Sequence, residues 1–331
     1  MRIAIISDGI PGHFNQSIGV ANLLDEDITT QQTTFNMVYK FPLIRSITRL
    51  YLRYLFKNVK NVKNLKFQKV LDIYYPLNLK DFDLIIATGG NTLFITAALS
   101  KKYNIPSIQI GSLRGLKSTY FTAHITVEPD DNSSSNIVTL LAPNKYKPNL
   151  ERNKMNKNKA LFLLGGDGAG YTYSVDDWKD LEKNIKYFES TTGIKPLIVT
   201  SRRTNKLHED YLYNEMRAYC DPASIWFHRG GENTDLNILF NNSDFIFVTE
   251  DSAMMITESV SSGLPVSTLS PKTIKTNIKY ENMLSRLESN SLISRLSFKS
   301  SLQINVLEGN EDRVCKIREL LKSNIMEKIS L

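Results

Sequence analysis

Cysteine is scarce in this 331-residue chain, and the two that occur, Cys220 and Cys315, have no spacing typical of a metal site. Two isolated thiols exclude a disulfide framework and indicate a reducing compartment. The four histidines are scattered, without an HxxxH or HExxH pattern. We therefore expect no zinc site and no bound metal.

Long apolar runs are also lacking. No run of about 18 apolar residues occurs, so no transmembrane helix is predicted. Met1 and Arg2 are followed directly by Ile-Ala-Ile-Ile, which is too short for the core of a secretory signal. We expect a cytoplasmic protein, and the net charge of +7 predicts an anionic partner.

Short apolar runs that end in polar or glycine-containing turns recur along the chain, which is typical of parallel strands followed by helices. The expected strands cover residues 3–6, 83–87, 106–110, 123–127 and 137–141, and then 160–164, 196–199, 224–227, 245–248 and 264–269. Residues 146–159 are polar and predict a linker. The pattern therefore predicts an α/β protein with Rossmann-like domains over 1–145 and 160–310. A final helix over 311–331 is expected to pack back on the first domain.

The first strand runs into a glycine-containing turn over residues 7–17, with the following helix expected from Ile18. Gly9 and Gly12 allow backbone to approach a ligand, and His13 is placed to act as a base near neutral pH. The alternative is a solvent-exposed loop histidine. Because parallel strands share a direction, the later turns open on the same edge. That edge is expected to carry Asp8, His13, Thr88, Asn91, Ser112 and Arg114, with Gly12, Asn15 and Gln16 beside them.

In the second half, residues 244–266 form one strand, polar turn, helix and strand. The free N–H groups at Ser252 and Ala253 favour a phosphate, and Glu258 could reach a ribose hydroxyl pair. Glu250 and Asp251 belong to the same expected donor site. The alternative is that these acids are solvated surface groups around an N-cap at Ser252.

Two more turns point to phosphate. Gly166, Asp167 and Gly168 follow a strand in a loop that could bring backbone N–H groups to a diphosphate, although no Walker lysine follows the glycines. Arg202 and Arg203 follow another strand, where their planar donors suit a phosphate clamp.

Residues 41–66 contain no acid. Arg45, Arg49, Arg53 and Lys57 are spaced by four, beside an apolar stripe with two tyrosines. Such a basic amphipathic helix suits an anionic membrane surface. A core-packed helix with a solvated basic face is the alternative, and no nucleic-acid-binding module is recognisable.

The chain resembles the mitochondrial-fission "elongated mitochondria" family, whose bacterial members are regarded as nucleotide-sugar glycosyltransferases. The resemblance rests on five stretches of the sequence: 7–17, 165–166, 200–204, 231–233 and 248–266. It implies the B-type glycosyltransferase fold, with two Rossmann-like domains facing across a cleft. A looser similarity to the GlcNAc transferase that makes lipid II implies that His13 lies near the acceptor hydroxyl and Glu258 on the donor ribose.

These implications combine into a hypothesis of sugar transfer from a nucleotide-sugar to a glycan or lipid-linked acceptor in cell-envelope polysaccharide or lipopolysaccharide synthesis. His13 would be the base, with Asp8 as its orienting group or reserve. No cofactor is expected; the donor is a substrate, with a UDP-sugar first and CMP or another nucleotide as the alternative. The enzyme would be cytoplasmic or peripheral on the inner face of the membrane. The competing hypotheses are a non-catalytic membrane-surface adaptor and a non-hydrolysing sugar-nucleotide epimerase.

Overall fold

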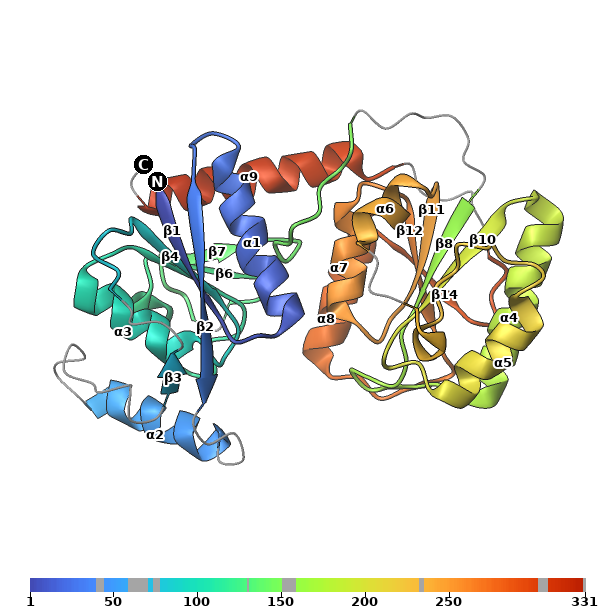
Figure 1. Cartoon of the computed structure of the whole chain (residues 1–331), viewed down its shortest axis with the longest axis horizontal. Helices are drawn as coiled ribbons and strands as arrows, with labels where there is room; N and C mark the ends of the chain where they lie inside the picture. Colours follow the sequence, from blue (N-terminus) through green and yellow to red (C-terminus); the bar gives the residue numbers. More distant parts are fainter. Residues whose placement is uncertain are drawn as a thin grey trace. The chain divides into compact units, whose positions relative to one another are not determined.

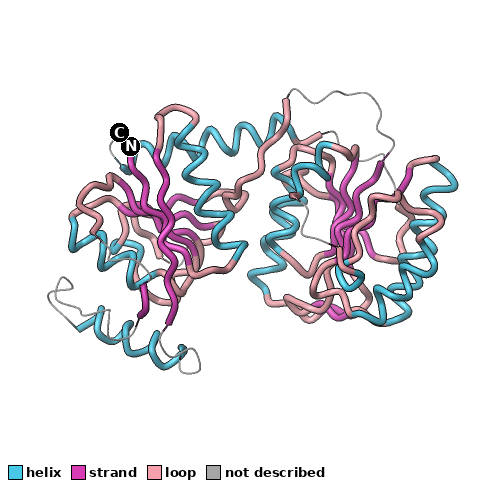
Figure 2. Tube along the Cα trace, in the orientation of Figure 1, coloured by secondary structure: helices cyan, strands magenta, loops and turns pink. Residues whose placement is uncertain are grey.

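The computed structural model describes residues 1–39, 45–58, 71–73, 78–129, 131–150, 159–231, 235–302 and 309–329. The chain divides into two compact units. The first comprises residues 1–145 and 317–331, and the second residues 146–316. Each unit is a sheet with helices on both of its faces (Figures 1 and 2).

The first unit is built on a seven-stranded sheet of order β3-β2-β1-β4-β5-β6-β7, parallel except for β3. Its strands are β1 (Arg2–Ser7), β2 (Gln31–Tyr39), β3 (Leu71–Ile73), β4 (Leu84–Thr88), β5 (Ser107–Ile110), β6 (Ala123–Thr126) and β7 (Asn136–Val138). Its helices are α1 (Pro11–Asp25), α2 (Arg45–Asn58), α3 (Leu93–Tyr103) and the end of α9 (Glu311–Ile329).

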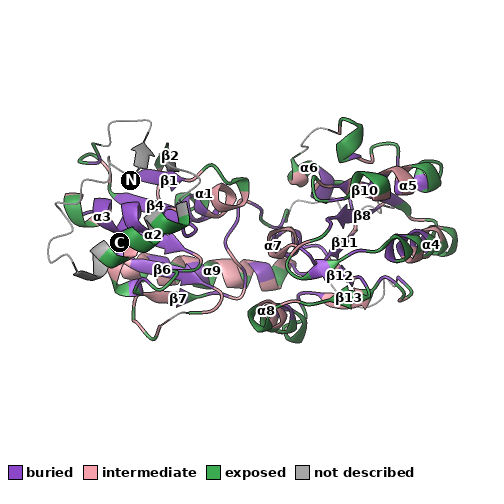
Figure 3. Cartoon of the chain, turned by 90° about the horizontal axis from the view of Figure 1, so that it is seen from below, coloured by how far each residue is buried: buried purple, intermediate pink, exposed green. Residues whose placement is uncertain are grey.

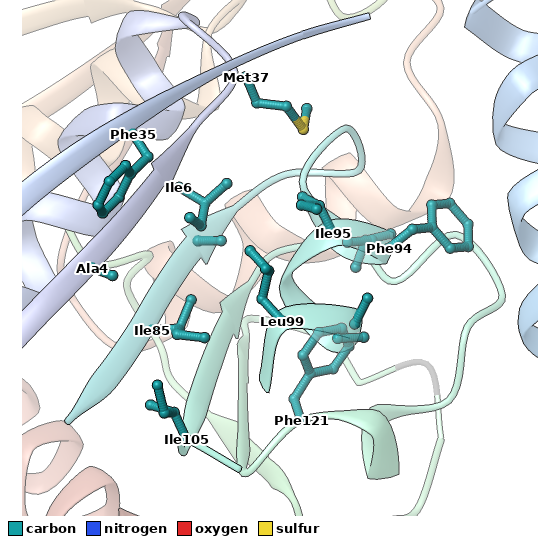
Figure 4. Close-up of a cluster of buried hydrophobic side chains, with 14 of the residues drawn as sticks. Ala4, Ile6, Phe35, Met37, Ile85, Phe94, Ile95, Leu99, Ile105 and Phe121 are labelled. Atoms are coloured by element: carbon teal, nitrogen blue, oxygen red, sulfur yellow. The ribbon is translucent and has the colours of Figure 1, made fainter. Parts of the chain in front are cut away.

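Two buried clusters cover the two faces of this sheet. One joins strand residues such as Ala4 and Ile85 to α3 and α2 (Figure 4). The other joins Ile3 and Ile86 to α1 and to Ile325 of α9. The final helix therefore packs on the first unit, because its apolar residues complete the cluster beneath α1.

The second unit has a five-stranded sheet of order β10-β8-β11-β12-β14. Its strands are β8 (Lys159–Leu164), β10 (Lys195–Thr200), β11 (Phe245–Thr249), β12 (Val266–Ser270) and β14 (Ser294–Ser297), all parallel; β9 (Tyr171–Thr172) and β13 (Thr273–Ile274) form a separate pair. Its helices are α4 (Val175–Thr192), α5 (Lys206–Met216), α6 (Leu236–Asn241), α7 (Ala253–Ser261) and α8 (Ile278–Ser289). The inner strands are buried (Figure 3).

Some expected elements differ. Helix α1 begins at Pro11 rather than Ile18, because proline is pre-organised for the first helical position. The strand expected over 224–227 is reduced to one bridge between Ile225 and Val199, followed by a 3-10 turn over Phe227–Arg229. The linker expected over 146–159 begins with residues of the second unit, since Tyr146 is buried against Phe240. Residues 151–158 lie outside the described residues.

Candidate functional site

The carboxyl ends of β1 and β4 bring together the first group of expected site residues. In the strand order of this sheet, the chain leaves β1 for β2 on one side and returns to β4 on the other. Such a switch point is where open parallel sheets bind ligands. Asp8 follows β1, His13 lies in the first turn of α1, and Asn91 follows β4.

These three side chains form one hydrogen-bonded group. The Nδ1 atom of His13 is 3.0 Å from Oδ2 of Asp8, and the Nδ2 amide of Asn91 donates to the same oxygen at 2.7 Å. The side chain of Asp8 is 3% exposed and that of His13 is 33% exposed. The carboxylate is therefore held inside the protein, while the imidazole is reachable from solvent.

The pair determines which histidine nitrogen is free to accept a proton. Burial acts to raise the pKa of Asp8, but hydrogen bonds and the charge of His13, with the Asn91 amide, bring that pKa below its ordinary value. An ionised carboxylate only accepts hydrogen bonds, so Nδ1 of His13 carries the proton that it donates. The Nε2 atom of the neutral ring is then an acceptor, as a general base requires.

Two glycines of the β4 turn explain how the group packs. A Cβ atom on Gly89 would collide with the His13 ring, and one on Gly90 would collide with the side chain of Arg114. Beneath them, the hydroxyls of Ser17 and Thr88 are 2.8 Å apart and buried. Arg114 therefore packs against Gly90, and His13 packs against the adjacent Gly89. Gly12, Asn15 and Gln16 lie on the first turns of α1 and are partly exposed.

In the second unit, the glycines after β8 have a role that the sequence did not indicate. A Cβ atom on Gly165 would collide with the Asp251 carboxylate, and one on Gly166 would collide with the backbone carbonyl of Arg203. A Cβ atom on Gly168 would also be tight against Arg203. The side of each glycine that a Cβ atom would occupy is therefore filled by the neighbouring loops, while Gly166 also lines a cavity.

Glu250 does not lie where a ligand could reach it. The residue is 0% exposed. Its carboxylate accepts from the Arg295 guanidinium at 2.9 and 3.1 Å, from Tyr171 at 2.9 Å and from Thr268 at 2.7 Å. These bonds satisfy a buried carboxylate completely, so Glu250 supports the loop after β11 and is not available to a donor.

Asp251 is likewise turned inward. Its Oδ2 atom is 2.7 Å from Nη2 of Arg203, and the Tyr173 hydroxyl donates to its Oδ1 at 3.3 Å. Burial, opposed by hydrogen bonds and by the charge of Arg203, raises the pKa of Asp251. Arg203 therefore neutralises a buried acid, and of the expected arginine clamp only Arg202 has no such partner among the described residues.

At the amino end of α7, the structure has the N-cap at Ser252 that the alternative interpretation gave: its side chain accepts from the backbone of Met255 at 3.4 Å. Ser252 and Ala253 are partly exposed. Glu258 is instead 7% exposed, and its charge helps to raise the pKa of Tyr146, mainly a result of burial.

A cavity of about 310 Å³ opens where β8 and β10 end. It is lined by Gly166, Asp167, Tyr173, Trp178, Arg202, Arg203, Thr204, Asn205, Lys206, His208 and His228. Four of these were expected donor residues; Trp178, Lys206, His208 and His228 were not. The position of Lys206 and His208, at the start of the helix after the arginine pair, is a sequence signal that could have indicated them.

The cavity is cationic and rigidly built. Arg202 and Lys206 are exposed, and Asp167 is the single acid among the residues that line the cavity. His228 is anchored, because its backbone donates to the buried Glu209 at 2.8 Å and its Nε2 atom is 2.7 Å from the Thr204 carbonyl. This arrangement can hold an anionic ligand that also carries a planar group.

The part of the chain that the structure describes contains no cluster of three or more histidine, cysteine, aspartate or glutamate side chains suited to a metal ion. The same residues include no helix whose length and apolar character would let it span a bilayer.

With two doubly wound units and ligand-type turns at their strand ends, the protein has the fold of the B-type glycosyltransferases. Among solved structures, the glycosyltransferase SnogD from Streptomyces nogalater is similar with a TM-score of 0.51 and 12% identity, covering 97% of this chain and 94% of SnogD. The UDP-GlcNAc 2-epimerase from Methanocaldococcus jannaschii gives 0.50 and 13%, covering 97% and 93%. MurG from Acinetobacter baumannii gives 0.45 and 13%, covering 99% and 94%.

The family is established by sequence. The model described as "Mitochondrial fission ELM1" matches residues 11–315, so the chain belongs to that family. No curated protein matches the sequence.

The buried ion pair of Glu250 yields a stability prediction. Replacing Arg295 with Met leaves Glu250 buried without its cation, and we expect a loss of about 3–5 kcal/mol in the free energy of unfolding. Urea unfolding measures it. The matched control is Arg229→Met, which breaks the half-exposed pair with Asp210 and should cost about 1 kcal/mol or less. Equal losses in the two variants would contradict a supporting role for Glu250.

Asp8 yields a pH dependence. Its pKa is lower in the folded protein than in the unfolded chain, so its carboxylate stabilises the fold above the ordinary range near pH ~4. This stabilisation is lost as the pH falls through the folded pKa. The stability advantage of the wild type over Asp8→Asn should therefore shrink between about pH 5 and about pH 2, as measured by urea unfolding. The control is Asp81→Asn at an exposed position; the same pH dependence there would refute the assignment.

Proposed function

We propose that the protein is a glycosyltransferase that moves a sugar from a nucleotide-sugar to a hydroxyl of a glycan or lipid-linked acceptor, in cell-envelope polysaccharide or lipopolysaccharide synthesis. The observation that carries the proposal is the Asp8–His13 pair, with its buried carboxylate and reachable imidazole. A surface adaptor needs no acid-held histidine at a ligand-binding switch point.

In the proposed reaction, Nε2 of His13 accepts the proton of the acceptor hydroxyl. The hydroxyl oxygen attacks the anomeric carbon of the sugar, and the bond from that carbon to the phosphate oxygen breaks. The nucleotide leaves with the bonding electrons, as a diphosphate from a UDP-sugar or a monophosphate from a CMP-sugar. General-base assistance of this kind contributes about 10²–10⁴ in rate.

The proposed donor site belongs to the second unit. Arg202 and Lys206 at the cavity, together with the N–H groups at Ser252 and Ala253, can stabilise the charge that develops on the leaving diphosphate. His228, an exposed residue of the cavity lining, offers a planar ring suited to a nucleotide base, whereas Trp178 and Tyr173 are buried at 0% and 4% exposure. The proposed reaction uses no metal ion and no cofactor. A UDP-sugar is the first candidate donor, and a CMP-sugar the next. The likeness to the glycosyltransferase SnogD and to a UDP-GlcNAc 2-epimerase agrees with a nucleotide-sugar donor.

The experiment is a turnover screen. The protein is incubated with UDP-, GDP-, CMP- and ADP-sugars and a mixed glycan or lipid-linked acceptor, and release of the nucleotide is followed. His13→Gln should lower turnover by about 10²–10⁴ while donor binding persists. Arg202→Gln should instead weaken the thermal shift, which for a saturating donor at a hundred times its Kd corresponds to about 2.7 kcal/mol.

Three outcomes would overturn parts of the proposal. Turnover that is unchanged in His13→Gln removes the base. An epimerised sugar formed without acceptor replaces the transferase with an epimerase on the same fold. No thermal shift with any nucleotide favours the adaptor.

A peripheral membrane location is part of the proposal, and α2 supports it. Ile47, Leu50, Tyr51 and Tyr54 fall three and four residues apart and are 53–64% exposed, so they form one uncovered apolar face. Helix α2 contains no acid, and Leu52 alone of its described side chains is fully buried. An apolar face on a basic helix fits the interface of an anionic membrane. The rest of the expected contact segment, residues 41–44 and 59–66, lies outside the described residues.

The membrane proposal is tested by co-sedimentation with phosphatidylglycerol vesicles. Replacing Leu50 and Tyr54 with Ser should lower the bound fraction several-fold, because each removes apolar area from the interface. Ile278→Ser with Leu320→Ser is the matched control, since both are equally exposed apolar residues on other helices. Unchanged binding in the α2 variant would exclude α2 as the contact.

A further inference from the structure

We infer that the face of the first unit that carries His13 binds a phosphoryl group through Arg53 and Arg114, so that the acceptor is a phosphorylated molecule. The inference deepens the proposed function by giving the acceptor a chemical class. It rests on that function only in treating this face as the acceptor side.

The side chain of each arginine packs against a glycine. The side chain of Arg114 occupies the place of a Cβ atom on Gly90, next to Gly89 under the His13 ring. The Nη2 atom of Arg53 is 2.7 Å from the Cβ position of Gly115, the residue after Arg114. His13 and Arg114 thus pack against the adjacent glycines Gly89 and Gly90, and Arg53 packs against Gly115, the residue that follows Arg114.

The two arginines are positioned by buried neighbours. Leu52 of α2, at 1% exposure, packs in the same hydrophobic cluster as Leu113 and Leu116, which flank Arg114 and Gly115. Arg114 has a φ of 46°, in the left-handed region that non-glycine residues rarely adopt. A strained residue that is held between two buried leucines presents its side chain in one direction.

The residues that the structure describes supply no counter-charge to Arg53 or Arg114. Among the described residues, neither guanidinium forms a hydrogen bond or ion pair with another side chain. The sequence contains no aspartate or glutamate between Asp27 and Asp72, or between Asp83 and Glu128, which are the segments that supply Arg53 and Arg114. The nearby carboxylate of Asp8 is already engaged by His13 and Asn91.

Two unneutralised, preoriented guanidiniums match the geometry of phosphate, whose oxygens accept paired N–H donors. A neutral sugar hydroxyl alone would leave both charges without a counter-charge. A phosphoryl group bound here would bring an adjoining hydroxyl close to Nε2 of His13. The source of that group is either a lipid headgroup or a soluble phosphorylated glycan.

The probe is inorganic pyrophosphate, titrated calorimetrically into the full-length protein. All variants carry Arg202→Gln and Lys206→Gln, which silence the cationic cavity of the second unit. In that background, Arg53→Gln with Arg114→Gln should weaken pyrophosphate binding at least tenfold. The charge-matched control, Lys101→Gln with Lys117→Gln, removes two exposed lysines from the same acid-free segment and should leave the affinity within about twofold.

The substitution of both arginines by lysine separates a shaped site from general positive charge. If the fork geometry matters, Arg53→Lys with Arg114→Lys binds more weakly than the background protein and more tightly than the glutamine pair. The inference would be overturned if Lys101→Gln with Lys117→Gln weakened pyrophosphate binding as much as the arginine-to-glutamine pair does. It would also be overturned if the background protein did not bind pyrophosphate. Thermal unfolding of each variant checks that it is folded.

Vesicles then identify the source. If pyrophosphate displaces the protein from phosphatidic acid vesicles, and does not displace the Arg53→Gln, Arg114→Gln variant from them, the phosphoryl group belongs to a lipid. If vesicle binding is insensitive to pyrophosphate, the acceptor is a soluble phosphorylated molecule. Neither assay uses turnover or a donor, so this inference and the proposed function can fail separately.

Discussion

The common direction of the strands is the constraint on which both candidate sites depend. In a parallel sheet every strand ends at the same edge, so the turns after β1 and β4, and those after β8 and β11, must meet even though many residues separate them in sequence. In the first unit, the side on which the chain adds strands changes between β1 and β4, so the turns after these two strands diverge and side chains from both can hold a ligand. In the second unit, the cavity lies at the ends of β8 and β10.

The two edges use their turns differently. In the first unit the glycines after β4 leave room for side chains that stay partly exposed, and the imidazole and guanidinium groups lie on them. In the second unit the glycines after β8 admit the Asp251 carboxylate and the backbone of the arginine loop. In the second unit the three loops therefore pack closely against one another, and the charged groups buried between them must be paired. Glu250 with Arg295 and Asp251 with Arg203 meet that requirement.

Both units carry positive side chains near their strand ends. The acids of the second unit nearest the strand ends are buried and neutralised, so the positive groups at the cavity rim face solvent against a single carboxylate. In the first unit, long acid-free segments leave arginine near the histidine without a counter-ion in the described structure. Both edges therefore present positive charge beside the turns at their strand ends.

The sequence by itself determined the architecture and most of the strands, because a buried parallel strand is a short apolar run and its turn is polar. It also indicated Asp8, His13, Asn91 and Arg114, since these follow strands and so lie at one edge. It could not separate ligand-binding acids from supporting acids: Glu250, Asp251 and Glu258 have the same local context as solvent-facing groups. Burial by residues distant in sequence, such as Arg295 and Tyr146, decides their role.

Only the tertiary structure decided what fills the space beside each glycine, which is a matter of which loops are neighbours. The glycines of 165–168 look in sequence like a phosphate loop, and in the structure Asp251 and Arg203 pack against them. The cavity residues Trp178, His208 and His228 come from three elements and show no shared pattern along the chain. Periodicity reports how one segment faces its own core, whereas a site is assembled across segments, and the distances between segments are set by packing.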